Sequence, residues 1–264
     1  MSKPTHLEPS ELGTKEYWDN LYTTEISNHA HNPADTGTVW FDDSDAEAKV
    51  IDFLSDPDPE LELHLSPEST SFLDLGTGNG SLLFGLRDAA WQGRMLGVDY
   101  SRQSVEFARR IAESRSQQGP DAAGSEEPVE FREHDILRTP ASALLADAQQ
   151  PRGWDVVLDK GTFDAISLSS ETDPASGRRI SESYRARVAP LIRDGGLFLV
   201  TSCNWTEEEL KSWFEGVRKD GEDDGDARGW RFDLVGRVEY PSFSFGGVKG
   251  QTISTLCFKK VRDT

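Results

Sequence analysis

Apolar positions in this 264-residue chain fall into short runs that alternate with stretches of helical spacing. Five mostly apolar runs are typical of buried strands, at 71–75, 94–98, 129–132, 154–159 and 196–201. Helical spacing marks the intervening segments 79–90 and 177–192, and also the stretch after Ser101, a predicted N-cap. Thr206 and Glu209 form a Thr-x-x-Glu capping box that predicts one more helix start. Strand and helix therefore alternate along most of the chain.

The last two predicted strands, 230–240 and 251–260, have no helical segment between them, so we expect them to pair antiparallel. The alternating order before them requires a mainly parallel sheet that is covered on both faces. We therefore predict an α/β fold with a Rossmann-like, doubly wound, seven-strand sheet and an antiparallel last strand. Ligands of such sheets bind beyond the carboxyl ends of the strands.

Three polar stretches interrupt this pattern at 114–128, 169–176 and 219–229. Each has too few apolar residues to bury, so we predict flexible loops rather than domain boundaries. The chain is then one domain over 1–264. Its first 60 residues form a helical, aromatic-rich segment that precedes the first sheet strand.

Hydrophobic residues make up 36% of the chain, a low share for a compact domain, and we interpret this as a normal core diluted by polar loops, since 13 Phe and 7 Trp are enough for a sizeable core. No apolar run approaches the roughly 18 residues of a membrane span, and the N-terminal residues have no signal-peptide pattern. These features predict a soluble, cytoplasmic protein. Cys203 and Cys257 could form one disulfide, but free thiols in a reducing compartment fit better, and they predict no metal site.

The formal net charge of -19 disfavours nucleic acid and anionic membranes as partners, because both are bound through basic side chains. A basic protein partner would be attracted instead. The alternative is that the acids only keep the protein in solution.

A glycine-rich turn follows the first strand, in the sequence Leu73-Asp-Leu-Gly-Thr-Gly-Asn-Gly80. Glycines let a ligand approach the backbone, which makes Gly76, Thr77, Gly78, Asn79 and Gly80 candidate cofactor-binding residues. The spacing is not that of dinucleotide-binding proteins, and the carboxylate of Asp74 would repel a pyrophosphate. Asp74 suits a cationic ligand, such as an α-amino group or a sulfonium. A tight turn with no ligand is the alternative.

The second and third strands also end in candidate cofactor-binding residues. Asp99 lies where a ribose-binding acid is expected, and Tyr100 could pack on an adenine ring. Asp135 could accept a bond from the adenine amino group, with Ile136 as a wall. Asp99 could instead be a helix-entry acid, and Asp135 a simple loop acid.

The fourth strand ends in Asp159-Lys-Gly-Thr-Phe-Asp164, and the fifth is followed by Asn204-Trp205. We predict that Asp159 and Asp164 lie at the mouth where an amine would meet a methyl donor, with Asp159 also near the cofactor. Asn204 and Trp205 could wall a channel for an aliphatic amine. The alternatives are an ion pair between Asp159 and Lys160, and a core Trp205 beside a capping Asn204.

The N-terminal aromatics include Trp18 and Trp40. They could close the edge of the sheet, or they could form a lid over the charged end of a cofactor.

Five segments resemble a family of seven-strand lysine methyltransferases whose members methylate translation elongation factor 1-alpha. These segments are 13–19, 74–80, 159–167, 201–205 and 243–247, and the similarity extends from about Leu12 to Lys260. The resemblance implies S-adenosylmethionine as cofactor, a lysine of that basic elongation factor as substrate, and the antiparallel last strand. We expect a monomer.

Two other functions remain open at this point. The same site could methylate a small cationic molecule, or the chain could be a non-catalytic S-adenosylmethionine-binding module that acts through protein contacts. A nicotinamide-dependent dehydrogenase is disfavoured by the spacing of the glycines and by Asp74.

Overall fold

The computed structural model describes residues 4–57, 59–61, 63–118, 127–145, 150–216, 229–241, 243–245, 248–250 and 252–262. Its centre is a seven-stranded sheet in the order β3-β2-β1-β4-β5-β9-β6. The strands are β1 (Phe72–Leu75), β2 (Met95–Asp99), β3 (Glu130–Glu133), β4 (Trp154–Lys160), β5 (Ile192–Ser202), β6 (Trp230–Val238) and β9 (Ser254–Arg262). Strands β1 to β5 pair in parallel, and β9 runs antiparallel between β5 and β6. The predicted sheet and its antiparallel last strand are confirmed.

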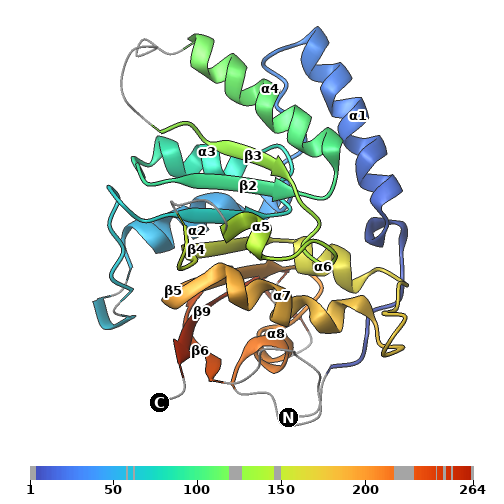
Figure 1. Ribbon diagram of the computed structural model, residues 1–264, viewed down its shortest axis with the longest axis vertical. Coiled ribbons are helices and arrows are strands. Elements are labelled where there is room, and N and C mark those ends of the chain that lie inside the picture. The colour runs from blue at the N-terminus through green and yellow to red at the C-terminus, as the bar shows by residue number, and fades with distance from the viewer. Residues whose placement is uncertain are drawn as a thin grey trace.

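Helices cover both faces of this sheet (Figure 1). One face is covered by α1 (Lys15–His31), α2 (Ala46–Ser55), α3 (Ser81–Asp88) and α4 (Arg102–Gln118). The other face is covered by α5 (Ser142–Leu145), α6 (Thr162–Ser167), α7 (Tyr184–Val188) and α8 (Glu207–Phe214). Successive side chains of β4 face opposite sides of the sheet. Val156 and Leu158 pack in the hydrophobic core on the first face, and Val157 packs in the core on the other face. The fold is therefore doubly wound.

Short elements complete the architecture. The 3-10 turns are η1 (Glu11–Gly13), η2 (Asp42–Ser44), η3 (Pro59–Leu61), η4 (Ile180–Ser183) and η5 (Ala189–Leu191). Along the chain, β6 is followed by a hairpin of β7 (Phe243–Phe245) and β8 (Val248–Gly250), and then by β9. The hairpin strands are too short for the sequence pattern to reveal. None of the described helices has the length and apolar character that crossing a bilayer requires.

Several local predictions need correction. The single helix expected over 177–192 is a series of short turns, η4, α7 and η5, and Pro190 near the start of η5 has no amide hydrogen to continue a helical ladder. The loop expected over 114–128 is wrong in its first part, because α4 extends to Gln118, and residues 119–126 lie outside the described residues. Residues 169–176 form an irregular loop with one bridge from Thr172 to Arg179, and most of the 219–229 stretch lies outside the described residues.

The two predicted helix caps, at Ser101 and Thr206, are confirmed. Thr206 and Glu209 form the reciprocal capping box of α8. The hydroxyl of Ser101 accepts a bond from the amide of Ser104 at 3.3 Å. Cys203 and Cys257 are free thiols, the first exposed and the second buried.

Candidate active site

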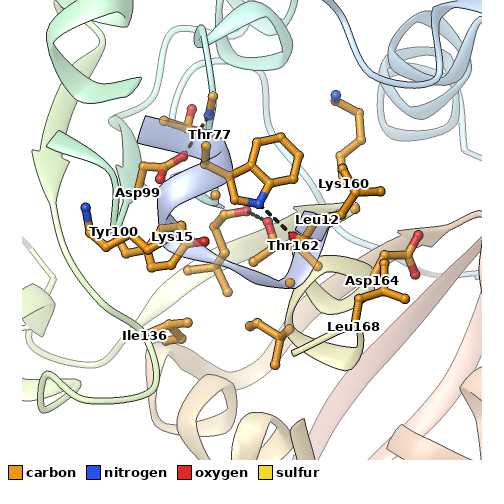
Figure 2. Close-up of a pocket in the computed structure, with 18 of the residues that line it drawn as sticks. Leu12, Lys15, Thr77, Asp99, Tyr100, Ile136, Lys160, Thr162, Asp164 and Leu168 are labelled. Atoms are coloured by element: carbon orange, nitrogen blue, oxygen red, sulfur yellow. Dashed lines mark hydrogen bonds between the residues drawn. The ribbon is translucent and has the colours of Figure 1, made fainter. Parts of the chain in front are cut away.

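A pocket opens where the parallel strands end, and the predicted site residues gather around it (Figure 2). It is bounded by the segments that follow β1 to β5 and by the N-terminal residues around η1, α1 and 38–41. Twelve predicted residues line it: Trp18, Trp40, Gly76, Thr77, Gly78, Asn79, Asp99, Tyr100, Asp135, Ile136, Asp164 and Asn204. Asp74, Gly80, Asp159 and Trp205 are outside this lining.

The glycine-rich turn brings backbone to the pocket wall. Gly76, Gly78 and Gly80 all have positive φ, at 66°, 58° and 82°. A Cβ atom on Gly78 would lie 2.7 Å from the Tyr22 hydroxyl oxygen, and one on Gly76 would lie 2.0 Å from Thr162 Oγ1. Both the conformation and the close packing therefore require glycine at these positions.

Asp74 lies on β1 beneath the turn, between Gly97 of β2 and Leu158 of β4. Only 3% of the residue is exposed, and burial raises the pKa of its carboxyl to about 7. A buried carboxylate gains stability from a nearby cation. The position is compatible with a positively charged ligand group above the turn, although the side chain is not part of the pocket wall.

Asp99 is held in place by three donors. Its Oδ1 accepts from the amide of Ser101 at 2.8 Å, and its Oδ2 accepts from the hydroxyl of Ser104 at 2.8 Å and the amide of Gly78 at 3.2 Å. Burial raises the pKa of Asp99, while these hydrogen bonds lower it. The helix-entry role and a pocket role coincide here, since Asp99 both holds the start of α4 and lines the pocket.

Asp135 and Ile136 form part of the wall after β3. Asp135 Oδ1 accepts from the amides of Leu137 and Arg138 at 2.9 and 3.1 Å, which is the role of a loop acid. Its neighbour His134 also lines the pocket but was not a sequence candidate. His134 is buried, burial lowers its pKa, and its Nε2 atom has no hydrogen-bond partner among the described residues.

Asp159 occupies a different place from the one expected. Only 1% of it is exposed, and it is outside the pocket lining rather than at the mouth of the pocket. Its carboxylate accepts from the amides of Thr162 and Phe163 at the start of α6, and from the hydroxyl of Tyr184 at 2.6 Å. Burial raises its pKa to about 7. Asp159 thereby fixes the helix that bears Asp164.

Asp164 does line the pocket and anchors the segment after β5. Its two carboxylate oxygens accept from the hydroxyl of Ser202 at 2.5 Å and the amide of Cys203 at 2.9 Å. Burial raises its pKa to about 6. The exposed Asn204 lines the pocket beside it. Trp205 instead packs in the core, where its indole donates to Ser167 Oγ at 3.3 Å.

The N-terminal aromatics form one side of the pocket. The Trp18 and Trp40 rings meet edge to face, with centroids 5.2 Å apart, and Trp18 Nε1 donates to the carbonyl of Leu12 at 2.8 Å. Lys160, labelled in Figure 2, forms an ion pair with Glu47 at 3.4 Å rather than with Asp159. Lys160 and Glu47 are 113 positions apart, so the sequence offered no local signal for this pair.

The residues present fit an elongated cationic ligand with an adenosine end. Asp99 can accept from hydroxyl groups, Ile136 supplies an apolar wall, and Asp74 and Asp164 supply buried carboxyl groups. Within the part of the chain that the structure describes, the indole Nε1 of Trp40 and the Nε2 of His134 are buried in the pocket lining and have no hydrogen-bond partner. Buried polar atoms of this kind are usually paired, so a ligand that supplies partners suits the pocket.

The fold and this pocket define a methyltransferase that uses S-adenosylmethionine. Residues 67–233 match the family model described as "Methyltransferase domain". The chain belongs to that family, and within it to the protein-lysine N-methyltransferases, the enzymes that its full-length relatives represent.

Those relatives come from fungi and vertebrates. The chain is 39% identical to protein-lysine N-methyltransferase EFM4 of Saccharomyces cerevisiae, over 98% of this chain and 99% of the relative. It is 31% identical to EEF1A lysine methyltransferase 2 of Homo sapiens, over 96% of this chain and 88% of the relative. Among solved structures, a TehB-like S-adenosylmethionine-dependent methyltransferase from Corynebacterium glutamicum shares the fold, with a TM-score of 0.50 at 14% identity. It covers 94% of this chain and 100% of that one.

Proposed function

We propose that this enzyme transfers a methyl group from S-adenosylmethionine to a lysine of translation elongation factor 1-alpha. The observation that supports this most strongly is the near full-length similarity to EFM4 and to the vertebrate EEF1A lysine methyltransferase 2. These matches, at 31–39% identity, span 96–98% of this chain and 88–99% of the two relatives, so the similarity is not confined to the segments that line the pocket.

We assign the donor side of the pocket to the residues after β1, β2 and β3. Asp99 would accept from the ribose hydroxyls, and Tyr100 and Ile136 would enclose the base. The glycine-rich turn would pass beneath the ligand, and Asp74 would stabilise its positive charge from below. Trp18 and Trp40 would close the charged end, which is the lid role expected of the N-terminal segment.

We assign the acceptor side to a second hollow that joins the first at Cys203 and Asn204. Its walls come from the end of β5 with the start of α8, from the end of β6 and from the start of β9: residues 202–208, Arg237, Glu239, Tyr240 and 252–254. Glu207, Glu208 and Glu239 are among them, and they would attract a basic protein surface. An acceptor lysine that crosses Asn204 would reach the pocket beside Asp164.

The chemistry forms a nitrogen–carbon bond, breaks a sulfur–carbon bond and releases one proton from the lysine nitrogen. S-adenosylmethionine supplies a methyl group on a sulfonium. The lysine must be neutral to react, and a free lysine has a pKa of about 10.4. Asp164, with a pKa of about 6, is a carboxylate at neutral pH and would hold the incoming ammonium in position. Desolvation inside the pocket would then favour loss of the proton, and positioning would supply the rate enhancement.

The test is methyl transfer from labelled S-adenosylmethionine to elongation factor 1-alpha that has been produced in bacteria, with mass spectrometry of the labelled protein. Label on one lysine supports the proposal, and Asp164→Asn should remove most of it. Label on free lysine or small amines would favour a small-molecule methyltransferase. Cofactor binding without any label would favour a non-catalytic module.

The cellular setting is part of the same proposal. We propose a cytoplasmic monomer that binds neither nucleic acid nor membrane, and the net charge of -19 supports this. Light scattering on the purified enzyme should give a mass near 29.3 kDa. A mass near twice that value would overturn the monomer.

A further inference from the structure

Lys160 joins three parts of the molecule that meet at the pocket. It is the last residue of β4, and its side chain lines the pocket with only 14% exposed. Its Nζ donates to the carbonyl oxygen of Trp40 at 3.1 Å and lies 3.4 Å from Glu47 Oε1. Glu47 Oε1 in turn accepts from the hydroxyl of Ser81 at 2.5 Å, at the start of α3 just after the glycine-rich turn. One chain of contacts therefore connects the lid, α2, β4 and the cofactor turn.

The lid needs such an anchor because the backbone after Trp40 is strained. Phe41 has φ 67° and Asp45 has φ 54°, and they flank η2 on either side. Left-handed backbone in residues other than glycine costs about 1–2 kcal/mol each. It persists where surrounding contacts hold it. Phe41 also packs over the turn after Lys160, since a Cβ atom on Gly161 would lie 3.2 Å from the Phe41 ring.

Trp40 faces the pocket, as Trp18 and Phe41 also do. It lines the pocket and meets the Trp18 ring edge to face. Its own carbonyl is the atom that Lys160 binds, so movement of Lys160 would release Trp40 directly. Glu47 neutralises the Lys160 charge and fixes its direction.

We propose that Lys160, held by Glu47, is a positioning residue that keeps Trp40 and Phe41 in place over the charged end of the cofactor. The proposal rests on the proposed function for the identity of the ligand and for the position of its charged end. Its consequences can be measured without turnover, on the enzyme with no acceptor present.

The experiment compares Lys160→Met with Lys49→Met. Lys49 donates to the carbonyl of Ser44, the last residue of η2, at 2.9 Å. Unlike Lys160, it is outside the pocket lining. Calorimetry should show S-adenosylmethionine binding about tenfold more weakly to Lys160→Met, the order of one lost charge-assisted hydrogen bond. Lys49→Met should stay within about twofold of the parent. Lys160→Arg should recover most of the affinity, since a guanidinium can contact both partners.

A second readout follows the lid itself. The seven tryptophan indole N–H signals in a ¹⁵N spectrum can be assigned by single Trp→Phe changes. In the ligand-free enzyme, Lys160→Met should shift or broaden the Trp40 signal and leave the Trp154 and Trp213 signals in place. Glu47→Gln should have the same effect, and the double variant should add little to either single one.

Two outcomes would overturn the proposal. One is an unmoved Trp40 signal with unchanged affinity in Lys160→Met. The other is equal losses in Lys160→Met and Lys49→Met, which would show a general effect on the turn. Neither result depends on the acceptor, so failure here is distinct from failure of the proposed lysine methylation.

Discussion

The hydroxyl of Tyr184 donates a 2.6 Å hydrogen bond to Asp159 Oδ2, and neither side chain lines the pocket. Tyr184 comes from α7, on the same face of the sheet as α6, and its ring stacks on Phe163 of α6 with centroids 5.4 Å apart. The pair therefore fixes the start of α6, and Asp164 of this helix lines the pocket. Of the two acids of the Asp-Lys-Gly-Thr-Phe-Asp run, Asp159 therefore holds the helix start and Asp164 lines the pocket.

Tyr184→Phe should lower the free energy of unfolding by about 1–2 kcal/mol, because a buried carboxylate loses a donor. The cofactor dissociation constant should change by less than about twofold, since both residues are outside the pocket. Urea denaturation and calorimetry measure the two quantities. A large loss of cofactor affinity at unchanged stability would contradict the positioning role of Asp159.

Asp164→Asn should lower turnover by about tenfold to hundredfold while cofactor affinity is retained, because the acceptor amine loses its carboxylate. Ser202→Ala is the matched control, since it removes one donor to Asp164 but leaves the carboxylate in place. Its loss of turnover should be smaller. Equal turnover in Asp164→Asn and the parent enzyme would remove Asp164 from the reaction.

Gly78→Ala should abolish measurable cofactor binding. The new methyl group would lie 2.7 Å from the Tyr22 hydroxyl oxygen on backbone with φ 58°. Gly177→Ala is the control, because it has a similar φ of 70° but no atom within 4 Å of the new Cβ. That variant should bind cofactor normally, so a shared loss would point to backbone strain alone.

Affinity for S-adenosylmethionine should rise as the pH increases from about 6 to about 7.5. Burial raises the pKa of Asp74 to about 7, so the carboxyl is largely neutral at the lower pH and ionised at the higher one. A cationic ligand binds better to the ionised form, and binding should release part of a proton. Asp74→Asn should bind weakly with a flat profile. If the affinity of Asp74→Asn for S-adenosylmethionine rises with pH as it does in the parent enzyme, the titrating group is not Asp74.

Charge reversal on the second hollow should weaken binding of the protein acceptor alone. Glu208→Lys with Glu239→Lys should raise the KM for elongation factor 1-alpha by about tenfold and steepen its response to salt. The KM for S-adenosylmethionine should stay the same. Glu106→Lys on α4 is the control, since Glu106 pairs with Arg110 on a helix outside both hollows. Equal effects from the control would indicate an overall charge effect.

Much of the architecture follows from the sequence, because periodicity and capping are local properties. The runs at 71–75 and 154–159 became β1 and β4, and the Thr206–Glu209 box begins α8 as predicted. The glycine spacing and Asp74 identified the class of ligand, since backbone freedom and charge are properties of single residues. The resemblance to elongation factor methyltransferases agrees with the relatives found over nearly the full chain.

Only the tertiary structure decided which of these residues reach the pocket. Asp159 and Asp164 are close in sequence, yet one is buried beneath α6 while the other lines the wall, because a helix start lies between them. Trp205 turned inward to the core, and Lys160 paired with Glu47 across 113 positions. Such contacts depend on how strands and helices cross in space, and no local pattern records the distance between side chains on different elements.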